Sequence, residues 1–313
     1  YLISRAPGVT GDLEREAEAA QRASLTDVSL VERAPIADYE SGTALRFPGQ
    51  GMFHPLKYIG GLARAIVDKY HGQIYCGTHV EGVEGGDPCN VKVEGGLSLS
   101  ASCVVGCTNG SRSDYLQTHP KMAPSRPYVI AAAVPRGSVD KALYWETGNP
   151  YHYVRTTALG SEPSAVSSQS PKSSAPTKGD TLWDALIVGG EDHKTGHDES
   201  PEKRWDDLAS WMRERWPQAR QVIYKWSGQV MEPSDGLAYI GRNPDGPQDV
   251  FMASGDSGQG MTHGTIAGIL ITDLVLGRDN PWERLYDPKR VSLGASSLKD
   301  LVKENGDGAP QYA

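Results

Sequence analysis

Hydrophobic side chains along this chain recur in some stretches with the period of a helix and in others with that of a strand. Residues 56–70 predict an amphipathic helix, because their apolar positions fall three or four residues apart. These positions are Leu56, Ile59, Leu62, Ala63, Ile66, Val67 and Tyr70. Residues 12–24, acidic at the start and rich in alanine, predict another helix. A third is predicted at residues 201–216, with an apolar face formed by Trp205, Leu208, Met212 and Trp216.

After His71 and Gly72 the spacing becomes that of β-structure. Residues 74–107 form short alternating runs separated by glycine-rich turns, which is typical of a meander. Its first strand is predicted at Gln73–Cys76. The last run, residues 102–108, is apolar nearly throughout, which predicts a strand buried on both faces. Together these elements favour an α/β sheet decorated by a small β layer.

A second group of strands is rich in aromatic and β-branched residues and predicts an antiparallel sheet. The strands are expected at residues 128–135, 142–145, 151–157, 182–188 and within 221–242. Between them, residues 160–179 consist mostly of Ser, Pro, Ala and Lys and cannot bury enough apolar area to offset the entropy of ordering. We interpret this segment as a disordered surface insertion. A domain linker is the alternative, but strands of the same kind resume after it.

The composition excludes several classes of function. The formal net charge of −8 comes without any local Lys/Arg cluster, which argues against nucleic-acid and anionic-membrane partners. No run is long enough to cross a bilayer, and the start at Tyr1 shows no secretory leader. Cys103 and Cys107 lie too far apart on a straight strand to form a bridge. No cysteine spacing suits a metal, so we expect reduced thiols and a cytoplasmic location.

Residues 250–277 carry the strongest chemical signal. A predicted buried strand at residues 250–254 runs into a glycine-dense loop at 255–264, and a small-residue helix at 265–276 closes at Gly277. Such a turn offers unpaired backbone N–H groups and the positive end of a helix dipole to an electron-rich ligand. Glycines allow a planar ligand to approach the main chain, since no Cβ stands in the way.

Four interpretations of this loop compete. A dinucleotide fingerprint needs a shorter glycine spacing and a following strand with an acidic residue, and neither is present. A serine-protease loop needs His and Asp partners in recognisable contexts. Glycines that serve only the packing of a strand against a helix are the structural alternative. The fourth interpretation is a flavin site, in which the helix start stabilises negative charge on the reduced ring.

The residues of this region resemble a known family. Residues 251–265 (FMASGDSGQGMTHGT), 273–277 (DLVLG) and 280–290 (NPWERLYDPKR) are similar to the C-terminal flavin-contact segment of D-amino-acid-oxidase-like FAD oxidoreductases. The branch they most resemble carries a Rieske iron–sulfur domain after this one. Three more stretches agree in the same order, namely residues 46–63, 189–196 and 226–242.

The resemblance implies FAD as cofactor and a fold of mixed α/β (α+β) type. A truncated Rossmann-like FAD/NAD(P)-binding domain would comprise residues 1–120 and 233–290, and an antiparallel-sheet substrate domain residues 121–232. Residues 291–313 would be a connector. The implied reaction is oxidation of a C–N bond in a small amine or amino-acid-like substrate, with hydride transfer to the flavin. The implied FAD contacts are Val80, Thr108, Asn109, Gly110, Gly241, Arg242, Gly255, Asp256, Gly258, Gln259, Gly260, Met261 and Thr262.

The chain departs from the family in three places. Nothing before Asp12 matches the G-x-G-x-x-G unit that holds the FAD pyrophosphate, so the alternative function is a non-catalytic remnant or binding module that has lost FAD. No Rieske ligand set follows Val291, and that partner is expected only in a full-length protein. Val230 stands where amino-acid-oxidising relatives often carry a carboxylate-binding Arg. A substrate with little charge near the reacting carbon is therefore favoured, unless Arg155 or Arg242 substitutes.

The remaining candidates are polar residues near turns and strands. His54, in a Phe-His-Pro turn, is a candidate proton acceptor or substrate contact, or else a structural residue at a helix entry. Tyr153 and Arg155 alternate along a strand and line either a catalytic pocket or a solvent face. His263 is expected to contribute through its backbone. His193 and His197 have zinc-like spacing but lie in a predicted loop, so no metal site is expected.

Overall fold

The computed structural model describes residues 1–4, 10–109, 121–148, 150–160, 182–196, 200–219, 221–244 and 246–290. These form two compact units. The first unit contains Tyr1–His54, Arg126–His193 and His197–Gly228, and the second contains Pro55–Ser125, Lys194–Gly196 and Gln229–Ala313. The expected boundaries grouped residues 1–120 together, whereas this division places Tyr1–His54 in the first unit. Gly110, His197, residues 161–179 of the expected insertion and the connector 291–313 lie outside the described residues.

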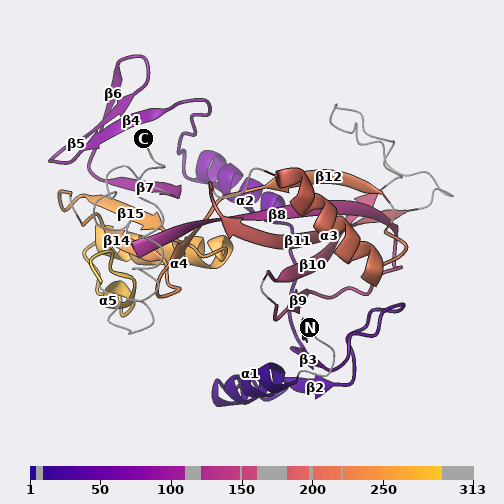
Figure 1. The fold of residues 1–313 in the computed structure, drawn as a ribbon. Coiled ribbons are helices and arrows are strands. Elements are labelled where there is room, and N and C mark those ends of the chain that lie inside the picture. Colours follow the sequence, from indigo (N-terminus) through magenta and orange to yellow (C-terminus); the bar gives the residue numbers. More distant parts are fainter. Residues whose placement is uncertain are drawn as a thin grey trace. The chain divides into compact units, whose positions relative to one another are not determined.

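Strands follow one another in long runs along the chain, with helices before and after these runs (Figure 1). The helices are α1 (Gly11–Arg22), α2 (Pro55–Arg64) with the π-helical turn η1 (Ala65–Lys69), α3 (Pro201–Arg215), α4 (Gly260–Val275) and α5 (Glu283–Tyr286). The strands are β1 (Leu2–Ile3), β2 (Ser29–Val31), β3 (Ala44–Arg46), β4 (Val80–Glu84), β5 (Cys89–Val93), β6 (Leu97–Ala101), β7 (Val104–Asn109), β8 (Met122–Pro135), β9 (Tyr144–Glu146), β10 (His152–Gly160), β11 (Trp183–Lys194), β12 (Val222–Ser227), β13 (Val230–Pro233), β14 (Tyr239–Arg242) and β15 (Val250–Ser254).

A large sheet forms the first unit, with the strand order β12-β8-β11-β10-β9-β1-β3-β2. Its central strands pair antiparallel, as the sequence predicts. Helix α3 lies across one face of the sheet (Figure 1) and buries Leu208, Met212 and Trp216 in a core with Tyr128 and Ile130. The predicted face of this helix is confirmed. It packs there because residues three to four apart form one apolar stripe.

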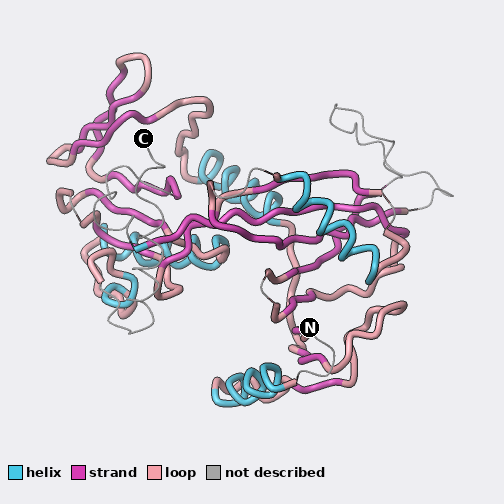
Figure 2. The backbone as a smooth tube through the Cα atoms, in the orientation of Figure 1, coloured by secondary structure: helices cyan, strands magenta, loops and turns pink. Residues whose placement is uncertain are grey.

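The second unit contains two small sheets (Figure 2). One is the predicted meander, β4-β5-β6, which is antiparallel throughout. The other has the order β14-β15-β7, with β15 parallel to β7 and antiparallel to β14. Helices α4 and α5 pack on it through Leu270, Leu274 and Tyr286, which share a core with Phe251 of β15.

Two predictions for the second unit are wrong. Gln73–Cys76 form no strand, because no described segment pairs with them, and Ile74 and Tyr75 remain exposed. Strand β7 is not buried on both faces: Val105 is 42 % exposed. In the described chain β7 pairs only with β15, so it is an edge strand. Burial on both faces requires elements packed above and below the sheet, and among the described residues the Val105 side chain is not covered in this way.

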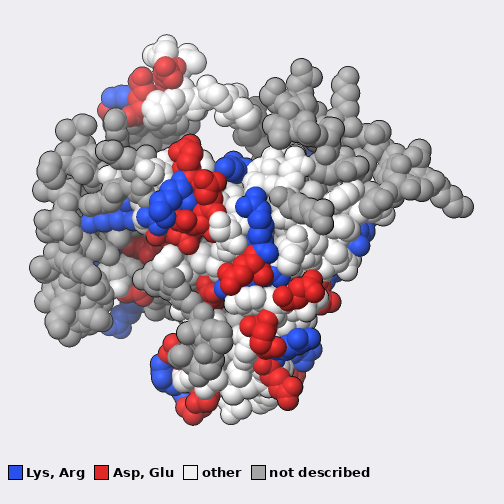
Figure 3. All heavy atoms as spheres, turned by 45° about the vertical axis from the view of Figure 1, so that its right-hand side comes forward, with Lys and Arg blue, Asp and Glu red and all other residues white. Residues whose placement is uncertain are grey.

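Helix α2 and the turn η1 confirm the helix predicted over residues 56–70. Their apolar stripe is exposed, however: Leu56, Ile59 and Leu62 are 74, 48 and 48 % accessible. None of the described helices has the length and apolar character needed to cross a membrane. The face in Figure 3 shows Lys and Arg interspersed with Asp and Glu. All four cysteines are free thiols.

Candidate functional site

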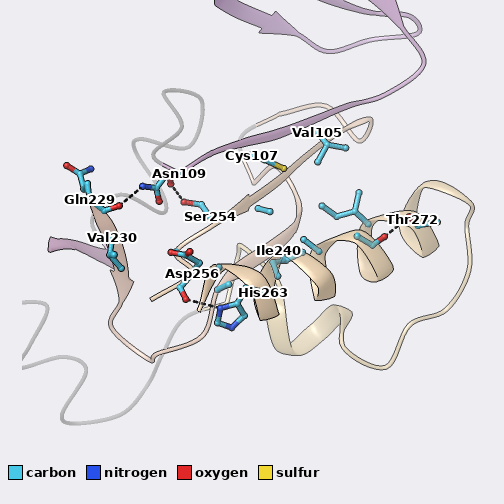
Figure 4. Close-up of a pocket in the computed structure, with 18 residues that line it drawn as sticks. Val105, Cys107, Asn109, Gln229, Val230, Ile240, Ser254, Asp256, His263 and Thr272 are labelled. Carbon is cyan, nitrogen blue, oxygen red and sulfur yellow. Dashed lines mark hydrogen bonds between the residues drawn. The ribbon is translucent and has the colours of Figure 1, made fainter. Parts of the chain in front are cut away.

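A cavity of about 540 Å³ lies within the second unit, between strands β7, β14 and β15 and helix α4 (Figure 4). This volume falls in the range of about 300–1,000 Å³ that is usual for small-molecule sites. Strand β7 lines it with every second residue, Val105, Cys107 and Asn109, as the alternation of side chains along a strand requires. Most of the wall is therefore apolar side chain or main chain.

Helix α4 supplies the opposite wall. It begins at Gly260, five residues before the predicted start at Thr265, so part of the expected loop forms its first turn. Residues three to four apart face the cavity, namely Gly260, His263, Gly264, Ala267, Gly268, Ile271 and Thr272. Five of these seven are small, and three of them are glycines at every fourth position from Gly260 to Gly268. That face leaves room for a ligand against the helix backbone.

The start of α4 offers hydrogen-bond donors. Gln259, the residue that precedes the helix, makes no side-chain cap, and the first turn holds no acidic residue. His263 is the first residue of the helix whose amide has a described acceptor, the carbonyl of Gln259 at 3.0 Å. The amides of Gly260, Met261 and Thr262 have no acceptor among the described residues. Their partial positive charge favours an anionic or electron-rich group.

The glycines of this region divide into two groups. A Cβ on Gly255 would come within 2.8 Å of Pro233, and one on Gly260 within 2.6 Å of the Asp256 carboxylate, so these two glycines serve packing. Gly264 and Gly268 would meet no atom within 4 Å, and both line the cavity. Packing within the protein therefore does not account for them. The open space suits a ligand that lies close to the helix.

Hydrogen bonds fix the loop that joins β15 to α4 (Figure 4). The buried His263 donates from Nδ1 to the carbonyl of Asp256 at 2.9 Å. Asn109 donates from Nδ2 to the carbonyl of Gln229 at 3.2 Å and accepts a hydrogen bond at its own carbonyl from the Ser254 hydroxyl. These contacts tie β7, β13 and β15 together around the cavity. Its polar wall is thus preorganised.

Four of the predicted cofactor contacts line this cavity, namely Asn109, Gly255, Asp256 and Gly260. The others, which the structure does not bring to its wall, are Val80, Thr108, Gly241, Arg242, Gly258, Gln259, Met261 and Thr262. Gly241 packs on Pro288, whose Cδ would lie 2.9 Å from an added Cβ. Arg242 donates to the carbonyl of Leu274 at 3.5 Å and stacks on Phe251. Both residues therefore make packing or hydrogen-bond contacts within the second unit, and their role at the cofactor stays a prediction.

Several wall residues were missed at the sequence level, although a signal for them exists. Val105 and Cys107 follow from the period of two on β7 that ends at Asn109. Ala267, Gly268, Ile271 and Thr272 follow from the helical period that starts at Gly260. Gln229, Val230, Ala238, Ile240 and Ala253 come from other strands, and only the sheet topology reveals them.

The first unit holds a second cavity, of about 820 Å³. Its walls are residues 46–54, parts of the segment 136–143, and Arg155–Ala158 of β10. Two of the three predicted catalytic residues, His54 and Arg155, line it. The Arg155 guanidinium donates from Nη2 to the carbonyl of Phe53 at 3.1 Å, which connects β10 to the Phe-His-Pro turn.

Tyr153, the third predicted catalytic residue, does not line this cavity. Its ring lies beside those of Trp145 and Tyr151, with centroids 5.8 and 6.1 Å apart. It also covers Gly189, where an added Cβ would come within 2.1 Å of the ring. Burial raises the pKa of Tyr153 to about 12, so the phenol stays protonated at neutral pH. The structure places this side chain in the packing of the sheet.

No group of three or more His, Cys, Asp and Glu side chains within the described chain could hold a metal ion. The cavity of the second unit instead presents Gly260, whose amide is unpaired among the described residues, together with open glycines and apolar walls. This combination suits a large planar cofactor that lies against a helix start.

Comparison with known proteins specifies the class. Residues 3–274 match the family model described as DAO, FAD dependent oxidoreductase, and the chain belongs to that family. Its cofactor is FAD. The open face of α4 and the free amides at its start fit a flavin, since the flavin carries negative charge when reduced and needs main-chain approach.

Among curated proteins, the chain is 24 % identical over 310 residues to the putative Rieske 2Fe-2S iron-sulfur protein YhfW of Bacillus subtilis (strain 168). The match covers 99 % of this chain and 56 % of that protein, so the chain spans little more than half of its relative. The Rieske-fused branch suggested by the sequence is consistent with this relative.

Solved structures show the same fold. Glycine oxidase from Geobacillus kaustophilus matches with a TM-score of 0.70 and 18 % identity, over 93 % of this chain and 74 % of that one. L-proline dehydrogenase from P. horikoshii matches with a TM-score of 0.66 and 17 % identity, over 92 % and 75 %. Iminodiacetate oxidase from Chelativorans sp. BNC1 matches with a TM-score of 0.66 and 13 % identity, over 92 % and 74 %. The predicted mixed α/β fold is confirmed.

Proposed function

We propose that the protein containing this chain oxidises a C–N bond of an amine or amino-acid-like substrate, with FAD as hydride acceptor. The family supports the oxidoreductase class, and the structural relatives named above act, by their names, on glycine, proline and iminodiacetate. All three are amines with a C–H bond beside the nitrogen. The observation that carries the proposal is the open face of α4 at Gly264 and Gly268, next to free amides at its start.

In this proposal the second unit is the FAD domain. Bound FAD supplies an acceptor for two electrons and a hydrogen. The amides of residues 260–262 would stabilise the negative charge that this transfer creates, as donors aimed at developing charge do in other enzymes. His263, held by its bond to Asp256, would keep the loop in place while the charge changes.

The first unit would be the substrate domain, with its cavity beside His54 and Arg155 as the substrate site. The substrate loses hydride from the carbon next to nitrogen, a C=N bond forms, and the proton leaves the nitrogen. His54 lines the cavity, and we assign it as the proton acceptor because imidazole is the side chain that most often serves as a general base. Water then hydrolyses the imine. An iron–sulfur partner, as in the name of the curated relative, or oxygen would reoxidise the cofactor.

The first test is cofactor retention. We expect the full-length protein to keep a flavin absorbance band through desalting, and that band to bleach anaerobically when a competent amine is added. A full-length protein that stays colourless after reconstitution with FAD would contradict the proposal. It would favour the alternative, a binding module without redox activity.

The second test places a larger side chain in the space proposed for the flavin. In Gly264→Leu a side chain enters open space on a helix, so folding is preserved and helix propensity improves by about 0.8 kcal/mol. We expect FAD affinity to fall by about tenfold or more, the loss typical of a blocked contact worth about 1.4 kcal/mol. The matched control is Gly61→Leu on α2, which also meets no atom within 4 Å and does not line the cavity. Equal FAD affinity in both variants would place the flavin elsewhere.

A further inference from the structure

Cationic side chains outnumber acidic ones in the cavity of the first unit, although the chain as a whole is acidic. Four cationic side chains line the cavity, Arg46, Arg136, Lys141 and Arg155, against one acidic side chain, Asp184. The whole chain has the opposite balance, with 31 Lys and Arg against 39 Asp and Glu. A local excess of cations in an acidic protein attracts anionic ligands, because walls of low dielectric focus the field.

Only one of these cations is neutralised. Arg136 pairs with Asp184, with Nε and Oδ1 3.2 Å apart. Within the described chain, Arg46, Lys141 and Arg155 form no ion pair. The cavity therefore carries three positive charges without counter-charges, and a singly charged ligand would neutralise only one of them.

Arg155 is the cation of this cavity whose positive charge is least well stabilised by its surroundings. It is half-buried on β10, between two neighbouring strands. Its described acceptor is the carbonyl of Phe53, and its buried Nε has no acceptor. A guanidinium withdrawn from water without a carboxylate is costly. Its planar donor edge is suited to a carboxylate, which it can bind with two parallel hydrogen bonds.

We infer that this cavity binds a dianion, and that the substrate is an amine or amino acid carrying two carboxylates. Arg155 holds one carboxylate, and the exposed Arg46 and Lys141 attract the other. This inference rests on the proposed function, in which the same cavity is the substrate site. It takes up the alternative left open at Val230, in which Arg155 substitutes for a carboxylate-binding Arg: Val230 lines the cavity of the second unit, and Arg155 lines that of the first.

The test measures binding without turnover. Succinate and butyrate have the same number of carbons but differ by one carboxylate, and calorimetric titration of the full-length protein at low salt gives both affinities. We expect succinate to bind about tenfold more tightly or better, and to lose affinity as salt screens the cavity. Equal affinities for the two acids would overturn the inference.

Substitutions of the cationic residues test whether succinate binds in this cavity. Arg155→Leu should weaken succinate binding about tenfold or more. Lys141→Gln and Arg46→Gln, which are exposed and should not disturb folding, should each weaken it about threefold and reduce its salt dependence. The control is Arg33→Gln, an exposed residue that pairs with Glu40 and does not line the cavity. Succinate affinity unchanged in Lys141→Gln and Arg46→Gln would overturn the inference even if Arg155→Leu failed to fold.

The outcomes separate the two proposals. If amines with one or no carboxylate reduce the flavin while succinate and butyrate bind equally, the oxidoreductase proposal stands and the dianion inference falls. If succinate binds selectively but no amine reduces the flavin, the cavity is a dianion site and the oxidoreductase proposal falls.

Discussion

His152 links four elements of the first unit through buried charges. Its Nδ1 lies 2.6 Å from Glu146 on β9, and its Nε2 lies 3.0 Å from Glu191 on β11. Arg215 of α3 lies 3.6 Å from Glu146, and Arg204 lies 3.4 Å from Glu191. Both ring nitrogens face carboxylates, so contacts on both sides hold the ring in place. The network fixes the register of β9, β10 and β11 beneath α3.

Asp192, next to this network, gives a pH-dependent prediction. Its Oδ2 accepts from the Tyr151 hydroxyl at 3.1 Å, while its Oδ1 is buried without a partner. Burial is the largest cause that raises the pKa of Asp192. The folded state therefore holds this proton to higher pH than the unfolded state, and stability falls as pH rises from the ordinary Asp pKa through the folded pKa.

We expect Asp192→Asn, which cannot ionise, to be more stable than the parent at pH 7, by less than about 1 kcal/mol because the site is partly exposed. The gain should vanish below the ordinary Asp pKa of about 3.9. Urea unfolding at both pH values measures it. Asp206→Asn, at a side chain 76 % exposed, is the control and should change little at either pH. A gain of equal size at both pH values would show that ionisation of Asp192 is not the cause.

Helices and strands were predicted correctly where the apolar face expected from the sequence is also the face buried in the fold. Helix α3 and strand β15 lie within one residue of their predicted bounds, because each has one consistent apolar face. The start of α4 was missed because its first turn contains glycines, which local pattern assigns to a loop. The exposure of β7 was missed because burial depends on which elements pack on the two faces of the sheet, and an apolar run does not show this.

The pairing of β10 with β11 gives a second prediction. Tyr153 lies directly opposite Gly189 in the register, and its ring fills the space that a Cβ would need. We expect Gly189→Ala to destabilise the protein by about 1–3 kcal/mol, as overpacking does. Tyr153→Leu in the same chain should recover part of that loss, because it removes the opposing ring. A double-mutant cycle by urea unfolding measures the coupling.

Steady-state kinetics of Tyr153→Leu, together with its stability, decide whether Tyr153 has a catalytic role. If Tyr153→Leu leaves the apparent KM and kcat for a competent amine unchanged, its role is packing, as the structure places it. A large loss of kcat with unchanged stability would instead support the catalytic role that the alternation with Arg155 suggested.

At the scale of the whole molecule, the order of segments along the chain does not show which of the two units each segment belongs to. The backbone passes between the two units after residues 54, 125, 193, 196 and 228. Local spacing shows where strands lie but not which unit they join, and for this reason the sequence grouped residues 1–54 with residues 55–120, whereas the contacts group them with the first unit. The cavity of the second unit was predictable at its glycine loop. The cationic cavity of the first unit was not, since Arg46, Lys141 and Arg155 come from three distant segments.

Strands β8 and β11 each contribute residues to both units, so we expect the two units to unfold together. Six of the seven tryptophans report on the first unit: Trp145, Trp183, Trp205, Trp211, Trp216 and Trp226. FAD, proposed to bind the second unit, stabilises the folded state by about 2.7 kcal/mol at a free concentration of about 100 times its Kd. If unfolding is cooperative, FAD should raise the midpoint of tryptophan fluorescence as much as the calorimetric midpoint. A calorimetric transition that moves with FAD while the fluorescence midpoint stays fixed would show that the units unfold separately.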